Sequence, residues 1–347
     1  MNLIIPFLRP IEHLLEDATV SEIMVNGNGL VFIERNGLLE ECQGIVFEPQ
    51  KLLTGIKNIA RCLGEDFSKD RPTLDSRLPN GSRICAVWPS ISLGELPTLN
   101  IRKFQGWRSL DELVKMGSLP IEVLNYLKIA IANRRNILIS GGVGTGKTSL
   151  LRALVTLIDP SQRIITIEDT AELNIDSHRN VVALEGKIEQ RDGEGKVLCP
   201  GVNARSLVKL AMRQRGDRLI LGEVRGSEAF DLLKALNSGS SGSFSSIHAD
   251  TSELSLEKLA MYVLEANTGM PLEAIYRNIG MAVHYVLQQA RFADGSRGVS
   301  ELIEIHSHDG VSFSNTLLYK RRTQKVPLIL ERFVNDDPFN TQGGLMR

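Results

Sequence analysis

Residues 141–148 read GGVGTGKT, and the interpretation of the whole chain starts from this stretch. It fits the pattern G-x-x-x-x-G-K-[ST], in which glycines let backbone N–H groups turn inward around phosphate oxygens. The apolar run NILIS before it is typical of a buried strand, and KTSLLRALVTLI, from Lys147 onward, has the spacing of a helix. A strand, a glycine loop and a helix in this order predict a phosphate-binding site, because the helix directs its positive end toward the loop.

The side chains of this loop predict which ligand it holds. Lys147 is placed to neutralise β- and γ-phosphate oxygens, and the Thr148 hydroxyl is placed to bind Mg²⁺. A glycine turn without a ligand is the alternative, but the flanking strand and helix are what a phosphate site requires. We therefore expect ATP and Mg²⁺ as cofactors, Thr148 as the metal ligand, and a set of nucleotide-binding residues in the loop: Gly141, Gly142, Val143, Gly144, Thr145, Gly146, Lys147, Thr148 and Ser149.

Beyond the loop, the chain alternates between strand and helix patterns. RIITIE, RLILGE and FSSIH read as strands, and segments between them, such as SEAFDLLKALN, read as helices. This alternation predicts a mostly parallel sheet with helices on its faces. HYVLQQARF and RGVSELIEIH flank an Asp-Gly turn and predict a hairpin at the far edge of the sheet.

The first hundred residues have a different pattern. SEIMVNGNGLVFIERNG predicts two strands around an Asn-Gly turn, and KLLTGIKNIARCLG predicts an amphipathic helix. We therefore expect an α+β domain over residues 1–104, a linker over 105–118, and a second domain over 119–347 with a weakly ordered tail from about 320.

The composition limits the class of protein. The 347 residues are 42% hydrophobic and 23% charged, with a net charge of −1, which suits about two globular domains without a general nucleic-acid footprint. Four cysteines without a CxxC pair argue against a zinc module and suit a reducing compartment. The start, MNLIIPFLRP, lacks the features of a signal peptide, and no apolar run reaches the ~20 residues that span a bilayer. The expected location is the cytoplasm, with any membrane association peripheral.

Acidic residues follow two of the predicted strands. RLILGE ends in Glu223, where a hydrolase needs an acid to activate water, although Gly222 stands where an aspartate usually holds the water of magnesium. Help is expected from Glu168, Asp169 and Glu172, because the carboxyl ends of parallel strands meet at one edge, where such acids can order Mg²⁺ and water. The alternatives are a solvated acid at Glu223 and a helix N-terminus that favours acids at the cluster.

The stretch NSGSSGSFSSIHAD, residues 237–250, permits two interpretations. Its Asn, Ser and Gly content favours a flexible tether between domains. It also follows an amphipathic pattern and ends in His248 beside Asp250, which favours a loop that brings one histidine to a site. A histidine satisfied within the core is a further alternative for His248.

Together these motifs resemble a known family, the traffic ATPases of type II and type IV secretion, which include pilus-assembly and conjugation ATPases. The chain carries the four marks of that family in order: the Walker A loop, IEDTAEL as the Asp box, RLILGEVRG as a Walker B motif ending in Gly-Glu, and IHAD at the end of the His box. SEIMVNG, RLPNGSR, NIRKF and LDELVKMGSL match as well, so the resemblance runs from about Ile11 to about Ile305. The four-cysteine zinc insert of many relatives is absent, so the chain is most similar to the type IV secretion and tight-adherence pilus branch.

The resemblance implies a fold and a set of roles. The fold is α/β, a RecA-like P-loop NTPase domain with a mostly parallel sheet, preceded by the smaller α+β N-terminal domain. Glu223 is implied as the catalytic base and His248 as a residue beside the γ-phosphate, so residues 237–250 are expected to be a site loop. The Asp-box acids are implied to support the metal and its water.

The resemblance also implies a role for basic residues. Arginines of the N-terminal domain are expected to reach the nucleotide, and three more match basic positions without an assigned partner. The first set is Arg77, Arg83 and Arg102, and the second is Arg213, Arg215 and Arg218.

The implied function is that of a Mg²⁺-dependent homohexamer that powers pilus assembly or the export of protein or DNA. Its partners would be inner-membrane platform or channel proteins of such a machine. Two departures stand out, because relatives often have a histidine where Ser240 stands and a proline where Gly216 stands. The alternatives are a RecA-like DNA translocase or helicase and an ATP-gated scaffold with little turnover. The near-neutral charge and the absence of interleaved aromatic and basic residues argue against DNA as the track.

Overall fold

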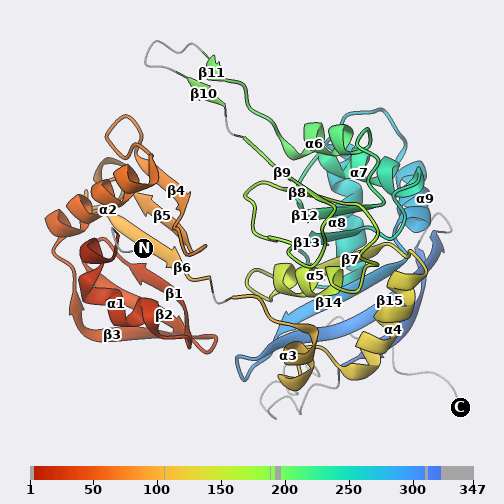
Figure 1. Cartoon of the computed structure of the whole chain (residues 1–347), viewed down its shortest axis with the longest axis horizontal. Helices are drawn as coiled ribbons and strands as arrows, with labels where there is room; N and C mark the ends of the chain where they lie inside the picture. Colours follow the sequence, from red (N-terminus) through yellow and green to blue (C-terminus); the bar gives the residue numbers. More distant parts are fainter. Residues whose placement is uncertain (1–3, 105, 188, 192–196, 309–311, 322–347) are drawn as a thin grey trace, which may run out of the picture.

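Two β-sheets, one in each part of the chain, organise the computed structural model (Figure 1). The structure describes residues 4–104, 106–187, 189–191, 197–308 and 312–321. The predicted tail from about 320 lies almost wholly outside these residues. An α/β fold with two sheets is therefore confirmed.

The first sheet is antiparallel throughout, in the order β3-β2-β1-β6-β5-β4. Its strands are β1 (Val20–Val25), β2 (Leu30–Arg35), β3 (Leu38–Val46), β4 (Thr73–Arg77), β5 (Arg83–Val87) and β6 (Thr98–Arg102). The predicted Asn-Gly hairpin is confirmed as β1–β2. The other elements of this part are η1 (Ile5–Phe7), η2 (Arg9–Ile11), α1 (Glu12–Glu16), α2 (Pro49–Leu63) and η3 (Pro89–Ile91).

One apolar face of this sheet makes its core. Ile23, Ile33 and Ile101 on the sheet and Ile56 and Ile59 on α2 are fully buried in one cluster. Alternate residues of a strand point to opposite faces, so the other face carries polar side chains. That polar face matters below, because it holds the arginines expected at the nucleotide.

The second sheet has the order β16-β15-β14-β7-β13-β12-β8-β9. Six neighbouring strands from β14 to β9 run parallel, and β15 and β16 add an antiparallel edge. The strands are β7 (Ile137–Gly141), β8 (Ile164–Glu168), β9 (Val181–Glu185), β12 (Arg218–Val224), β13 (Phe244–Ile247), β14 (Tyr285–Arg291), β15 (Arg297–His308) and β16 (Phe313–Lys320). A separate ribbon of β10 (Gln190–Arg191) and β11 (Val197–Cys199) projects beyond β9 (Figure 1).

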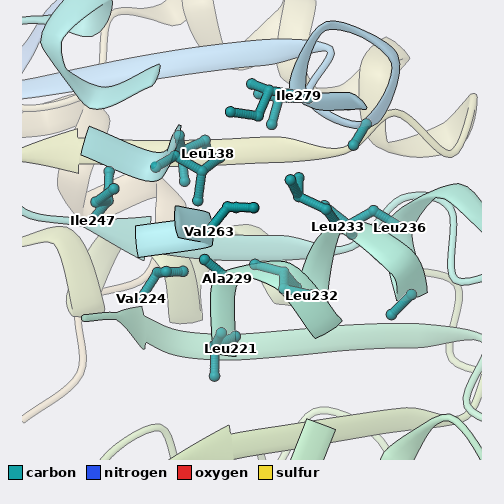
Figure 2. Close-up of a cluster of buried hydrophobic side chains, with 14 of the residues drawn as sticks. Leu138, Leu221, Val224, Ala229, Leu232, Leu233, Leu236, Ile247, Val263 and Ile279 are labelled. Carbon is teal, nitrogen blue, oxygen red and sulfur yellow. The ribbon is translucent and has the colours of Figure 1, made fainter. Parts of the chain in front are cut away.

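Helices cover both faces of the second sheet. One face carries α3 (Leu110–Lys115), α4 (Ile121–Ala132) and α5 (Lys147–Val155), and the other carries α6 (Ala204–Ala211), α7 (Glu228–Asn237), α8 (Ser252–Leu264) and α9 (Leu272–Ala282). On β12, Leu219 and Leu221 join the second of these cores, and Ile220 between them joins the first. Figure 2 shows the second core, where α7, α8 and α9 pack on the sheet. The predicted mostly parallel sheet with helices on its faces is thus observed.

The parallel order has one consequence for function. The carboxyl ends of β7, β8, β12, β13 and β14 meet at one edge of the sheet, which we call the catalytic edge. Residues before the first residue of each strand lie at the opposite, amino edge. In open α/β sheets, ligands bind at the carboxyl edge.

Candidate active site

The glycine loop leads from β7 into α5 at the catalytic edge, as the sequence predicts. Gly146 is the N-cap of α5 and lies in the left-handed region (φ 95°), which a residue with a side chain adopts only with strain. Thr145 Oγ1 donates to the Gly142 carbonyl at 3.0 Å and closes the loop on itself. Val143 at the tip is exposed, whereas Thr148 and Ser149 on the first turn of α5 are half-buried.

Lys147 is a buried cation under this loop. Its Nζ donates to the carbonyls of Gly141 (2.9 Å) and Gly142 (2.8 Å) and lies 3.0 Å from Nδ1 of His248. Burial lowers the pKa of Lys147 to about 8, while the charge of Glu223 opposes that shift. A buried ammonium held only by neutral groups favours an added anion, which is what a phosphate supplies.

His248 joins Lys147 to the predicted base. An ammonium has no acceptor, so Nδ1 of His248 accepts from Lys147 and the ring proton lies on Nε2. Burial, followed by the charge of Lys147, lowers the pKa of His248, and this favours the neutral ring. Nε2 lies 2.9 Å from Glu223 Oε1 but is not aligned for a hydrogen bond, so that buried oxygen has no donor among the described residues.

Glu168 on the neighbouring strand explains why residue 222 is a glycine. A Cβ placed on Gly222 would lie 2.9 Å from Glu168 Cγ, so no side chain fits at residue 222 while Glu168 is there. The carboxylate of Glu168 accepts from the backbone N–H groups of Glu172 (3.0 Å) and Leu173 (3.1 Å). Glu168 therefore occupies the space beside Gly222.

The three Asp-box acids lie close together but in different surroundings. Glu168 is 8% exposed, and burial raises its pKa to about 7. Asp169 is exposed and faces Arg225 at 3.5 Å, whereas Glu172 forms an ion pair with Arg83 of the first sheet at 3.1 Å. The structure brings all three to the catalytic edge without giving them one shared ligand.

The arginines of the first sheet face the same edge. Arg83 also donates to Thr170 Oγ1 at 3.2 Å. Arg77 lies close enough to Glu168 for its charge to oppose the rise of that pKa, and its buried Nε has no partner among the described residues. Arg102 lies close enough to Lys147 to help lower the pKa of Lys147. The three predicted arginines therefore surround the site, with Arg83 held by an Asp-box acid.

The three arginines to which the sequence assigned no partner lie on the segment that leads into β12 at the amino edge and at the start of that strand. Arg218 is 2% exposed and donates to Gln162 Oε1, the Gly242 carbonyl and the Ile131 carbonyl, so its guanidinium is held within the fold. Arg213 and Arg215 are exposed in the turn before β12.

Residues 237–250 are not a tether between domains. They contain the end of α7, a turn and all of β13, so both ends lie within the second sheet. Ser240 precedes β13 at the amino edge, whereas His248 follows it at the catalytic edge. Ser240, where relatives often have a histidine, is therefore separated from His248 by the length of β13 within one chain.

Four residues at the catalytic edge were not predicted from the sequence. Arg225 Nη2 donates to Glu223 Oε2 at 2.8 Å, and the charge of Lys258 on α8 helps lower the pKa of both Lys147 and His248. Gln288 donates to the carbonyls of Ala249 and Asp250, and Gln289 lies opposite Gly141 in the sheet register. Strand order decides which of these residues reach the site, and no local pattern reports it.

The site fits Mg-ATP through its unpaired groups. Within the part of the chain that the structure describes, the side-chain oxygens Glu223 Oε1 and Gln289 Oε1 are buried without a donor, and Lys147 is buried without an anion within hydrogen-bonding distance. Nowhere in the described residues do three His, Cys, Asp or Glu side chains gather closely enough to hold a metal by themselves. Mg²⁺ is commonly bound through one or two protein groups together with substrate phosphates. Thr148 would be the protein ligand.

The comparisons with known proteins define the class of the protein that has this site: it is an ATP hydrolase. The chain belongs to the family described as Type II/IV secretion system protein, whose model matches residues 8–325. This confirms the family expected from the motifs.

Individual relatives agree with this membership. The chain is 32% identical over 305 residues to the type IV secretion system protein VirB11 of Brucella suis biovar 1 (strain 1330), covering 81% of this chain and 83% of that protein. It is 34% identical over 298 residues to the conjugal transfer protein TrbB of Rhizobium radiobacter, covering 85% and 86%. The X-ray structure of the Legionella pneumophila ATPase DotB matches with a TM-score of 0.62 at 18% identity, covering 86% and 80%, and supports the fold. No helix among the described residues has the length and apolar character needed to cross a membrane.

Proposed function

We propose that this chain is a Mg²⁺-dependent ATPase that assembles as a homohexamer and powers a type IV secretion-type machine at the cytoplasmic face of the inner membrane. The observation that carries the proposal is the contact series from Lys147 through His248 to Glu223 at the catalytic edge. It places a cation for phosphate, a neutral imidazole and a carboxylate within one site. We take the second domain, over residues 119–347, to be RecA-like.

Lys147 binds the β- and γ-phosphates in this mechanism. Its present partners are two loop carbonyls and His248, which it exchanges for phosphate oxygens when ATP enters. This exchange removes the donor from Nδ1 of His248. The position of His248 therefore depends on whether Lys147 holds a phosphate, which suits a residue that reports the γ-phosphate.

Glu223 takes the proton of the attacking water. Arg225 holds its Oε2, and the buried Oε1 contacts His248 Nε2 at 2.9 Å without an aligned donor among the described residues, so Oε1 is the oxygen that accepts the proton. A general base has to reach the proton that it removes within hydrogen-bonding distance. When bound, Mg²⁺ neutralises charge that develops on the β- and γ-phosphate oxygens.

The first sheet completes the site from the opposite side. Arg83 is held by Glu172, and Arg77 and Arg102 lie near Glu168 and Lys147. Closing the two domains on ATP brings these positive charges toward the phosphates, where they stabilise the transition state. Hydrolysis then loosens the closed arrangement, and the resulting domain motion is the work that the machine uses.

The proposed setting follows from the relatives. A VirB11 protein of type IV secretion and a TrbB protein of conjugal transfer are similar over most of this chain, so the expected partners are inner-membrane platform or channel proteins. The expected cargo is a pilus subunit, a protein or DNA.

Phosphate release by the purified protein tests the activity. Glu223→Gln should bind a fluorescent ATP analogue as the wild type does and lose turnover, because an amide does not accept the water's proton. Glu273→Gln, an exposed acid of an ion pair on α9, serves as the control and should retain wild-type turnover. Hydrolysis at the wild-type rate by Glu223→Gln would show that another residue is the base. Hydrolysis that requires DNA and separates its strands would favour a translocase.

A further inference from the structure

A row of charged side chains crosses five of the six strands of the first sheet, from β2 to β4. The sheet register pairs each member directly with the next, and directly paired residues place their side chains on the same face. The row runs Glu34, Glu22, Arg102, Arg83 and Arg77. It is acidic at one end and basic at the other, and the three arginines expected at the nucleotide form its basic end.

The acidic end is held by the β14–β15 hairpin of the second sheet. Arg291 Nη2 lies 2.9 Å from Glu34 Oε2, and Arg297 Nη2 contacts Glu34 Oε1. These two arginines face each other across the hairpin, and Ser21 adds a hydrogen bond to Glu34 Oε1 at 2.7 Å. Burial opposes ionisation of Glu34, but these partners keep its pKa below the ordinary value, so the carboxylate is charged.

The two ends of the row contact complementary charges. Glu34 meets the arginines of the hairpin, and Arg83 meets Glu172 of the Asp box. If the sheet were turned end for end, the arginines would face Arg291 and Arg297 and the acids would face the Asp box. Like-charge juxtaposition opposes that arrangement, so the row selects one orientation.

The hairpin is also part of the nucleotide site. Gln289, two residues before Arg291, pairs with Gly141 at the start of the glycine loop. Gln288 holds the carbonyls that follow His248. A bulge interrupts the register with β15 between these glutamines, as is common beside active sites. The strand that holds the first sheet thus also supports the loop and the His box.

We propose that Arg291 and Arg297 are positioning residues for ATP hydrolysis: by holding Glu34, they fix the first sheet in the orientation in which its arginines face the nucleotide. This inference rests on the proposed function for its kinetic consequence. The clamp itself, the contact of Glu34 with both arginines, is a structural claim with its own test.

The kinetic test compares steady-state ATP hydrolysis by the wild type with that of variants in which the charges of the clamp are removed or reversed. Glu34→Gln and the double variant Arg291→Gln/Arg297→Gln should each lower kcat/KM about tenfold, roughly the effect of losing one charge-assisted hydrogen bond. Combining them should lower it no further, because both break the same contact. Reversing the charges together, Glu34→Arg with Arg291→Glu and Arg297→Glu, should restore most of the activity, which a merely structural role for the side chains does not predict.

Glu22→Gln is the matched control. Glu22 belongs to the same row but bonds Asn100 within its own sheet, so kcat/KM should stay at the wild-type value. Wild-type kcat/KM in Glu34→Gln, or an equal loss in Glu22→Gln, would overturn the proposal. Circular dichroism and thermal unfolding of each variant show whether it is folded. Where a variant is not folded, Glu34→Asp takes its place in the comparison.

A cross-link tests the clamp without reference to activity. Arg297→Lys keeps the charge and supplies an amine that a carbodiimide joins to the carboxylate of Glu34. Mass spectrometry of the monomer fraction should find the peptide around Glu34 joined to the peptide around position 297, and adding Glu34→Gln should abolish that product. Failure to cross-link in folded protein refutes the clamp. If Arg297→Lys cross-links as expected and the wild type does not hydrolyse ATP, the result would count against the proposed function alone.

Discussion

At the scale of single residues, Lys147 shows how the site is prepared for its ligand. It is 6% exposed, and its contacts are two carbonyls and one neutral imidazole. A buried charge is retained when it has a partner, and in the proposed mechanism the partner of opposite charge is the phosphate of ATP. The contacts observed for Lys147 are those that ATP has to replace.

Lys147→Ala should abolish hydrolysis and weaken nucleotide binding, because the charge on the β- and γ-phosphates is no longer neutralised. Equilibrium titration with a fluorescent ATP analogue and a phosphate-release assay measure the two effects. Lys128→Ala, an exposed lysine on α4, is the control and should bind and hydrolyse as the wild type does. Unchanged affinity in Lys147→Ala would contradict the assignment of the loop.

Gly222→Asp tests whether Glu168 leaves room for a side chain at residue 222. The new Cβ would lie 2.9 Å from Glu168 Cγ, so we expect a loss of roughly 1–3 kcal/mol in the free energy of unfolding, as for overpacked sites. Adding Glu168→Ala removes the clash and should recover part of that loss. Chemical denaturation measures both. If the second change makes Gly222→Asp less stable still, the steric explanation fails.

Glu168 also predicts a pH dependence. Its pKa in the folded state is raised from 4.5 to about 7, so its neutral form is favoured by folding. The contribution to stability is fully present below pH 4.5 and is lost as the pH rises through about 7. Relative to Glu168→Gln, the wild-type free energy of unfolding should therefore fall across this interval. Denaturation curves at several pH values for both proteins check it, and parallel pH profiles would contradict it.

At the scale of elements, the turn between α7 and β13 is fixed by long-range contacts although its composition resembles a linker. The carbonyl of Gly242 accepts from Arg218, and its N–H donates to Asn136 Oδ1 at 2.7 Å. Asn136 also accepts from Ser243 N, so one side chain on the neighbouring segment orients the start of β13. The turn is therefore ordered by its partners, which lie far from it in the sequence.

A comparison of Gly242→Ala with Gly239→Ala separates the effect of backbone strain from the effect of a steric clash in this turn. Both glycines have positive φ, 80° and 117°, so both substitutions introduce backbone strain. A Cβ on Gly242 would also lie 1.5 Å from Arg218 Nη1, whereas a Cβ on Gly239 meets nothing within 4 Å. Gly242→Ala should therefore be less stable than Gly239→Ala by roughly 1–3 kcal/mol in chemical denaturation. Equal stabilities would show that Arg218 moves freely.

At the scale of the whole molecule, two sheets meet around one site, and hydrolysis is expected to depend on both. Arg83 with Glu172 and Arg291 with Glu34 join them at opposite ends of the charged row. A fragment of residues 105–347 retains the glycine loop, Glu223 and His248 but lacks Arg77, Arg83 and Arg102. Its kcat/KM should be at least about tenfold below that of the full chain, since each charge-assisted hydrogen bond contributes about 1.5–3 kcal/mol. Full activity in the fragment would contradict the role of the first sheet.

Assembly is the second prediction at this scale. If the site lies near a subunit boundary, a nucleotide bound there tightens the oligomer by linkage. Mass measurement at micromolar protein with a non-hydrolysable ATP analogue should give six subunits. A monomer under every nucleotide condition would contradict the proposed hexamer.

The sequence by itself determined the features that rest on neighbouring residues. The glycine loop, the helix that follows it, the hairpins β1–β2 and β14–β15 and the acids after β8 and in β12 are all set by local spacing, so they were predicted. The strands β3, β4, β9, β10, β11 and β16 were not predicted.

Only the tertiary structure decided which distant residues meet. Glu168 fills the space beside Gly222, Arg218 binds carbonyls at the amino edge, and Ser240 lies a strand length from His248, because strand order and register place them there. The contact of Arg297 with Glu34 joins residues 263 positions apart. Local periodicity reports the face on which a side chain lies but carries no information about which strand becomes its neighbour. In the second sheet, that choice buries apolar side chains on both faces.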